Sequence, residues 1–167
     1  MKEVSRLRSD TWMDYFGILK SFCWDNPIEI DQNLYLGNLS HSFFRNSLTG
    51  CRIKGIVNVT NDSPNYYPEH DIDYFNINIG DLNDSNISEF LEQSYEFILK
   101  HASKGENVLV HCVFGRSRSV AICVYYLMKK YNLSFEEAYK KIEKKKYFIN
   151  INQSFADQIN TIFVNKD

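Results

Sequence analysis

The chain alternates short apolar strands with helical segments, and this alternation constrains its fold more than any other feature. Apolar runs of strand length and composition fall at residues 34–36, 55–59, 74–79 and 107–111. Helical periodicity appears at residues 85–101 and 120–131, after Ser134, and from about Gln153. Strands separated by helices require crossover connections. The pattern therefore predicts an α/β fold with a central, mostly parallel sheet of four to five strands flanked by helices.

Some helix ends carry recognisable signals. Ser134, with Glu137 three residues later, forms a capping box that predicts a helix start. For the helix at 85–101, Ser85 or Ser88 is the expected N-cap, and Gly105 follows its end.

Length and composition indicate the domain organisation. The chain has 167 residues, 44% hydrophobic and 24% charged, which fits one globular domain with a buried core. Residues 1–27 differ from the rest, because their aromatic and apolar side chains fall at helical spacing: Trp12, Tyr15, Phe16, Leu19 and Phe22. We predict a helical extension over residues 1–27, either packed on the domain or docking a partner, and one domain over residues 28–167.

The charge balance and the chain ends narrow the class of partner. With 19 basic and 21 acidic side chains, the net charge is −2, so we expect no nucleic-acid partner and only local recognition of anions. The N-terminal stretch lacks the apolar centre of a signal peptide, and the apolar run at 120–128 is too short to span a bilayer. Neither end carries a lipidation signal, so we expect no membrane anchor. A cytoplasmic or nuclear location with reduced cysteines is predicted.

Between the strand at 107–111 and the next helix lies a short loop that carries the chemistry. Its sequence is CVFGRSR, with Cys112 first, Gly115 in the middle and Arg118 last. Five intervening residues suffice to wrap backbone N–H groups around a tetrahedral oxyanion, and Gly115 permits backbone angles that side chains resist. The Arg118 guanidinium can bind two phosphate oxygens at once, and the following helix adds its positive end.

Cys112 is the predicted nucleophile. Cysteines at helix N-termini beside cations have pKa values of roughly 3.5 to 7.5, so the thiolate is expected at neutral pH. Ser119 can donate a hydrogen bond to the sulfur, and His111 can hold the loop. A cysteine that ends a buried strand is otherwise an inert small hydrophobe, which is the interpretation we give to the others: Cys23, Cys51 and Cys123. No metal-ligand spacing joins the four cysteines.

Transfer of a phosphoryl group to a cysteine also needs an acid, which protonates the oxygen of the leaving group. Asp81 and Asp84 both lie in the loop before the helix at 85–101. Position favours Asp81, which directly follows the strand and Gly80, while Asp84 has the place of a helix-capping carboxylate. Asp62 and Asp73 are interpreted as loop and surface charges.

The stretch VLVHCVFGRSRSVAICVYYLM resembles the signature of the dual-specificity branch of the protein tyrosine phosphatases. The likeness runs from about Ile30 to Gln158 and includes NLYLGNL, GIVNVT and SFEEAYKKI. The resemblance implies a protein tyrosine phosphatase-like fold and a small, stand-alone catalytic domain over residues 28–167.

The resemblance also implies a mechanism and a set of site residues. Cys112 forms a cysteinyl-phosphate, and Asp81, favoured over Asp84 by its spacing to the next helix, acts as acid and then base. No metal or cofactor is implied. Asn152 matches a loop-bracing asparagine, although Ile151 and Ser154 stand where the family has proline and glycine. The phosphate is held by Arg118 and by the loop amides of Val113, Phe114, Gly115, Arg116, Ser117 and Arg118.

Three functions are compatible with this sequence. The first is a phosphatase acting on phosphotyrosine and on phosphoserine or phosphothreonine in proteins. The second applies the same chemistry to a phosphoinositide, an RNA 5′ end or a phosphoglucan, with Arg116 as a second cation. The third is a module that binds phosphoproteins without turnover, against which the presence of Cys112 argues. The lysines at 140, 141 and 144–146 are interpreted as a solvated helix face that can favour acidic substrate flanks.

Overall fold

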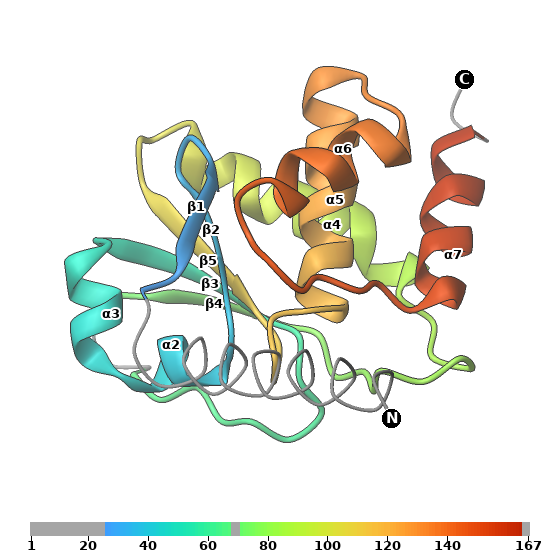
Figure 1. The fold of residues 1–167 in the computed structure, drawn as a ribbon. Helices are drawn as coiled ribbons and strands as arrows, with labels where there is room; N and C mark the ends of the chain where they lie inside the picture. Colours follow the sequence, from blue (N-terminus) through green and yellow to red (C-terminus); the bar gives the residue numbers. More distant parts are fainter. Residues whose placement is uncertain (1–25, 68–70, 165–167) are drawn as a thin grey trace, which may run out of the picture.

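A five-stranded sheet forms the centre of the molecule (Figure 1). The computed structural model describes residues 26–67 and 71–164. The strand order is β1-β2-β5-β3-β4, with β1 antiparallel to β2 and the other pairs parallel. The strands are β1 (Ile28–Asp31), β2 (Leu34–Gly37), β3 (Ile53–Asn58), β4 (Asp73–Asn76) and β5 (Asn107–His111).

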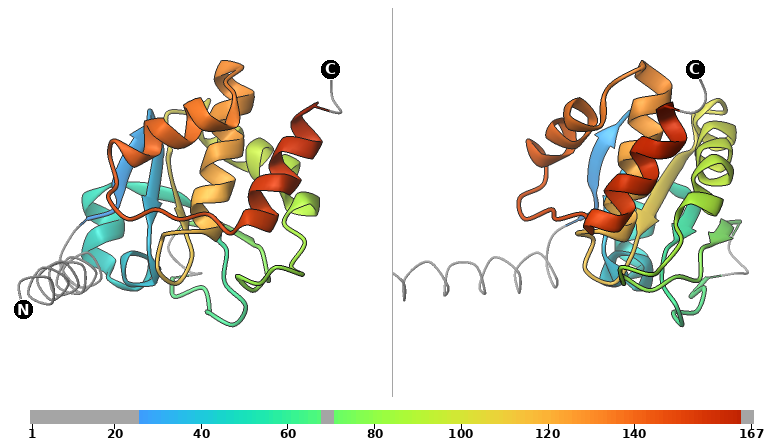
Figure 2. Two further views of the ribbon diagram at one scale, coloured as in Figure 1. Left: turned by 45° about the vertical axis from the view of Figure 1, so that its right-hand side comes forward. Right: turned by 90° about the vertical axis from the view of Figure 1, so that its right-hand side faces the viewer.

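Helices cover both faces of this sheet (Figures 1 and 2). One face carries the two short helices α2 (Leu39–Phe43) and α3 (Arg45–Gly50). The other carries the long helices α4 (Ser88–Ala102), α5 (Arg118–Tyr131), α6 (Phe135–Glu143) and α7 (Gln153–Val164).

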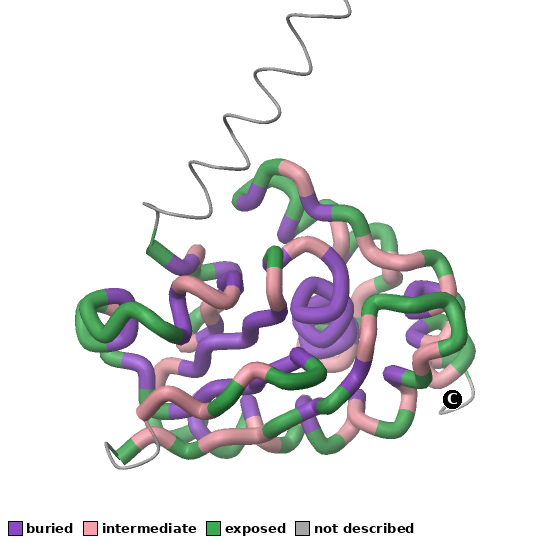
Figure 3. The backbone as a smooth tube through the Cα atoms, turned by 90° about the horizontal axis from the view of Figure 1, so that it is seen from below, coloured by how far each residue is buried: buried purple, intermediate pink, exposed green. Residues whose placement is uncertain are grey.

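The central strand β5 faces both layers because successive side chains of a strand point to opposite sides. Val108 and Val110 belong to the large core cluster that includes the apolar residues of α5, whereas Leu109 packs with Leu48 of α3. Helix α5 is itself buried over most of its length, as its purple colour in Figure 3 shows. Since β5 and α5 are both largely buried, the loop that joins them is anchored at both ends.

The structure confirms the predicted α/β class and the mostly parallel sheet. Strand β5 has the predicted bounds, and the other predicted strands lie within a few residues of their expected places. Three elements, β1, α2 and α3, were not predicted, because they are only four to six residues long and too short for a periodic pattern. The division into residues 1–27 and 28–167 stays a prediction, since the helix predicted around Trp12 lies outside the described residues.

Two predicted helix starts need correction, while the capping box of Ser134 and Glu137 on α6 is confirmed. Helix α4 starts at Ser88, and its N-cap position is Ile87, without a side-chain cap of its own. The amides of Ile87 and Ser88 instead donate to Oε1 of Gln158 on α7, at 2.8 and 3.1 Å. The predicted caps Asp84, Ser85 and Ser88 were therefore wrong. Gln158 of a distant helix and the nearby Asn86, whose Oδ1 accepts from the Ser88 amide at 3.1 Å, supply the acceptors. Helix α5 starts at Arg118, two residues earlier than predicted.

No helix in the described ranges is long and apolar enough to cross a bilayer.

Candidate active site

Cys112 follows β5 directly, and its sulfur is held by groups from the loop and from α5. The Gly115 amide donates to Sγ at 3.2 Å, and Ser119 Oγ lies 3.2 Å from the same sulfur. Only 2% of Cys112 is exposed. The sulfur thus lies at the base of a curled loop and beside the first turn of a helix, where a negative charge on it is favoured by amide dipoles.

Gly115 allows the loop to curl closely against the end of β2. Its φ is +68°, a conformation that glycine adopts without strain. A Cβ at this position would lie 2.5 Å from the carbonyl oxygen of Gly37, which is backbone and cannot move aside easily. The Leu39 amide also donates to the Val113 carbonyl at 3.1 Å, so the β2–α2 connection supports the loop from one side.

Arg118 is a buried cation at the first position of α5. Only 7% of the residue is exposed, and Nη1 donates to the carbonyl of Ile79 at 3.1 Å. Among the described residues, Nε has no hydrogen-bond partner, and Asp81 Oδ2 lies 3.8 Å away from it. A buried, incompletely bonded guanidinium is costly unless an anion joins it. This arrangement therefore indicates an oxyanion-binding site.

The structure brings Asp81, but not Asp84, into contact with this loop. Asp81 Oδ1 accepts a hydrogen bond from Ser117 Oγ at 2.7 Å, and 35% of its side chain is exposed. Asp81 and Arg118 also line the same hollow, of about 580 Å³, together with Leu39, Thr60, Tyr66 and Val113. Asp84 is exposed and does not line that hollow.

The connection between α6 and α7 supports the loop from another side. We call its residues 148–152 the strap. The Asn150 amide donates to the Arg116 carbonyl at 2.9 Å, and Arg116 Nε donates to the Phe148 carbonyl at 2.8 Å. The Asn152 amide donates to Ser117 Oγ at 3.0 Å. The backbone of the strap, more than its side chains, therefore contacts the loop.

Two sequence expectations change in the light of these contacts. Asn152 meets the loop through its backbone, while its side-chain Oδ1 accepts from the Ser154 amide at the start of α7. The guanidinium of Arg116 is bonded to the strap, and Arg116 is not among the residues that line the hollow with Asp81. Phe114, by contrast, is 58% exposed, so its side chain lies at the loop surface.

His111, just before the cysteine, is buried and neutral. Burial lowers the pKa of His111 from 6.5 to about 4. A hydrogen bond with the Cys112 backbone opposes this shift, and electrostatic interactions with His41 and Arg118 add to it. The His111 carbonyl accepts from the Val59 amide at 2.9 Å. This residue thus joins β5 to β3 at the point where both strands end.

The other described cysteines lie in environments that disfavour a thiolate. Burial raises the pKa of Cys123 well above its usual range, and the nearby Cys112 adds to this. Burial also raises the pKa of Cys51, with a further contribution from Glu29. Cys23 lies outside the described residues.

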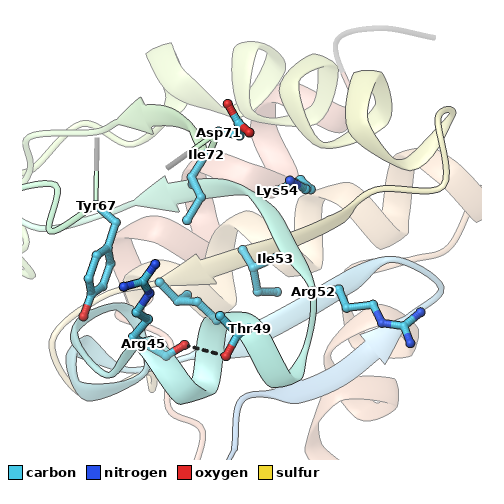
Figure 4. Close-up of a pocket in the computed structure, with 9 residues that line it drawn as sticks. Arg45, Thr49, Arg52, Ile53, Lys54, Tyr67, Asp71 and Ile72 are labelled. Carbon is cyan, nitrogen blue, oxygen red and sulfur yellow. Dashed lines mark hydrogen bonds between the residues drawn. The ribbon is translucent and has the colours of Figure 1, made fainter. Parts of the chain in front are cut away.

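A second hollow, of about 540 Å³, lies between α3, the start of β3 and the segment before β4 (Figure 4). Arg45, Arg52 and Lys54 line it beside Tyr67 and Ile72, but Arg52 points away from Arg45 and Tyr67. Its cations therefore do not converge on one point. Within the described ranges, no cluster of three or more His, Cys, Asp or Glu side chains could hold a metal ion.

The sequence analysis missed the residues that connect the loop to distant elements. Gln158 of α7 bonds the start of α4 and also donates to the Ser85 carbonyl at 2.9 Å, so it holds the end of the loop that carries Asp81. No local pattern marks a glutamine in mid-helix for such a role. Phe148 has a φ of +62°, unusual for an aromatic residue, and this too has no sequence signal.

The fold and this loop define a class of protein. Residues 34–164 match the family profile "Dual specificity phosphatase, catalytic domain". The chain therefore belongs to the dual specificity phosphatase family, as its loop sequence predicts.

Named relatives support the same assignment. The chain is 40% identical over 134 residues to human "Dual specificity protein phosphatase 9", covering 80% of this chain and 35% of that protein. It is 30% identical over 137 residues to "Protein phosphatase Slingshot" of Drosophila melanogaster, covering 82% and 13%. The chain thus spans about a third or less of the length of these relatives. The solved structure of human "tyrosine phosphatase-like serine/threonine/tyrosine-interacting protein" superposes with a TM-score of 0.79 at 26% identity, covering 84% of this chain and 97% of that one.

Substituting Gly115 tests the close packing of the loop. We expect Gly115→Ala to lower the free energy of unfolding by about 3 kcal/mol, since a positive φ and a backbone clash act together. Gly105→Ala is the matched control, because Gly105 has a φ of +72° with open space around it and should lose only about 1 kcal/mol. Urea unfolding of both variants measures the difference, and equal losses would exclude the contact with Gly37.

The buried His111 predicts a pH dependence of stability. Between pH 6.5 and 4 the unfolded chain binds a proton at this residue and the folded chain does not, so stability falls as the pH is lowered. The expected loss over this range is about 3 kcal/mol. Urea unfolding of the wild type and of His111→Asn, at several pH values, isolates this contribution. Parallel pH profiles for the two proteins would contradict a neutral, buried histidine.

Proposed function

We propose that this chain hydrolyses phosphotyrosine and phosphoserine or phosphothreonine in proteins, through a covalent intermediate on Cys112. The observation that carries the proposal is the buried Arg118 guanidinium, whose Nε has no hydrogen-bond partner among the described residues and which lies in the same short loop as the Cys112 sulfur. A tetrahedral phosphate oxyanion supplies the charge and acceptors that such a group requires.

In the first step the Cys112 thiolate attacks phosphorus in line with the leaving oxygen. The S–P bond forms as the P–O bond breaks, and the electron pair of that bond passes to the leaving oxygen. Asp81 donates its proton to this oxygen, which leaves as a neutral hydroxyl. The guanidinium of Arg118 and the loop amides of residues 113–118 hold the transferring group.

In the second step water hydrolyses the cysteinyl-phosphate. Asp81, now a carboxylate, takes a proton from the water as its oxygen attacks phosphorus. The new P–O bond forms as the S–P bond breaks and its electron pair returns to sulfur, so inorganic phosphate is released and the thiolate is regenerated. The hydroxyl of Ser119, 3.2 Å from Sγ, is placed to stabilise the departing thiolate by a hydrogen bond.

The side chain of Arg116 favours a protein substrate over a more highly charged phosphate. A phosphoinositide or an RNA 5′ end would gain from a second cation beside Arg118. The Arg116 guanidinium is instead bonded to the Phe148 carbonyl at 2.8 Å. We infer a phosphoprotein as the substrate partner and a reducing compartment, cytosol or nucleus, in which Cys112 remains a thiol.

Replacing the nucleophile tests the covalent mechanism. We expect Cys112→Ser to lower turnover of phosphotyrosyl and phosphothreonyl peptides by roughly four orders of magnitude or more, while peptide binding is retained. Cys51→Ser is the matched control and should keep activity, because Cys51 lies outside the loop. Steady-state kinetics and fluorescence-polarisation binding measure the two quantities. Appreciable turnover by Cys112→Ser would refute a cysteinyl-phosphate.

Replacing the acid tests the role of Asp81. We expect Asp81→Asn to lower kcat on phosphotyrosyl peptides by about 10² to 10³-fold, since an unprotonated tyrosyl oxygen leaves poorly. An aryl phosphate with an activated leaving group should lose far less. Asp84→Asn is the control and should have little effect on either substrate. Equal losses on both substrates for Asp81→Asn would show that another group is the acid.

A further inference from the structure

Ser117 occupies a helix N-cap position, yet its side chain does not cap the helix. It precedes α5, and serine is among the residues preferred at that position because its oxygen can accept from the first helical amides. No such hydrogen bond is present, although Ser117 is only 7% exposed. Its hydroxyl is directed away from α5 to two other elements of the structure.

The two hydrogen bonds of Ser117 determine the direction in which its hydroxyl points. The backbone N–H of Asn152 can only donate, so Ser117 Oγ is the acceptor at 3.0 Å. An ionised carboxylate can only accept, so the Ser117 hydrogen is donated to Asp81 Oδ1 at 2.7 Å. Reversing the second bond, with Asp81 protonated on Oδ1, would leave a buried hydroxyl hydrogen without an acceptor, which is unfavourable.

We propose that Ser117 is a positioning residue for Asp81, whose hydrogen bond to Oδ1 confines the transferable proton to Oδ2. This inference rests on the proposed function, in which Asp81 is the acid. Oδ2 is the oxygen on the Arg118 side, 3.8 Å from Nε. The proton is therefore held on the oxygen that lies nearer the guanidinium, and hence nearer to a phosphate bound by Arg118.

The same hydrogen bonds make the strap part of the acid's support. The Asn152 amide orients Ser117, and Ser117 orients Asp81, so the α6–α7 connection positions a residue from the loop before α4. Gln158 of α7 holds the other end of that loop through the amides of Ile87 and Ser88. Helix α7 and the residues before it thus constrain the acid loop at two points.

A double-mutant cycle with two substrates tests the proposal. We expect Ser117→Ala to lower kcat on a phosphotyrosyl peptide about tenfold, and to have a much smaller effect on an activated aryl phosphate. In an Asp81→Asn background residue 81 has no acidic proton to donate. There, adding Ser117→Ala should lower kcat on the peptide less than twofold further. Ser117→Thr keeps the hydroxyl and should restore most of the activity on the peptide.

The controls separate positioning from a general effect on the loop. The inhibition constant of orthovanadate reports on the intact loop, and it should differ less than threefold between Ser117→Ala and the wild type. If that variant does not unfold cooperatively in urea, Ser117→Cys, of similar volume with a weak donor, replaces it in the cycle.

Each result decides between defined alternatives. The proposal for Ser117 would be overturned by any of three results. Ser117→Ala could leave kcat unchanged, lower kcat equally on both substrates, or lower kcat equally in the wild-type and Asp81→Asn backgrounds. Failure of the proposed acid is recognised separately, because Asp81→Asn alone would then lose activity equally on the peptide and on the activated phosphate.

Discussion

The desolvation of the Arg118 guanidinium is the constraint on which the rest of this structure depends. A cation with only 7% exposure is unfavourable unless its surroundings supply compensating charge and acceptors. The Ile79 carbonyl and, when it is ionised, the side chain of Asp81 supply part of that compensation, from the segment that follows β4. A bound oxyanion, as in the proposed function, would supply the remaining charge and hydrogen-bond acceptors.

Three separate parts of the chain contact the loop that carries this cation. Gly37 and Leu39 contact it from the β2–α2 connection, the strap from the α6–α7 connection, and Asp81 from the loop before α4. The β2–α2 connection and the segment after β4 reach the loop because the parallel strands β2, β5, β3 and β4 end at the same edge of the sheet, while the strap reaches it from the helical layer. A curled backbone with inward amides is stable only when its shape is imposed from outside, and the convergence of strand ends provides that.

How much of the molecule could be predicted differs between elements for identifiable reasons. Strand β5 and helices α5 and α6 followed from apolar periodicity and a capping box, because those patterns are local and long enough to be unambiguous. Strand β1 and helices α2 and α3 were missed because each has only four to six residues, too few for a periodic pattern. The start of α4 was misplaced because one acceptor of its first amides is Gln158, 71 residues away from Ile87, and the other is Asn86 in place of a serine or Asp84.

The sequence by itself determined the order of strands and helices and the chemistry of the loop. The spacing of Cys112, Gly115 and Arg118 makes an anion-binding curl possible in any chain that has this strand before it and this helix after it. Only the tertiary structure decided which groups meet that loop: Asp81 and not Asp84, the backbone and not the side chain of Asn152, and the hydroxyl of Ser117 directed to Asp81. The physical reason is that hydrogen bonds between distant segments depend on how the sheet and helices pack, which no local pattern of residues encodes.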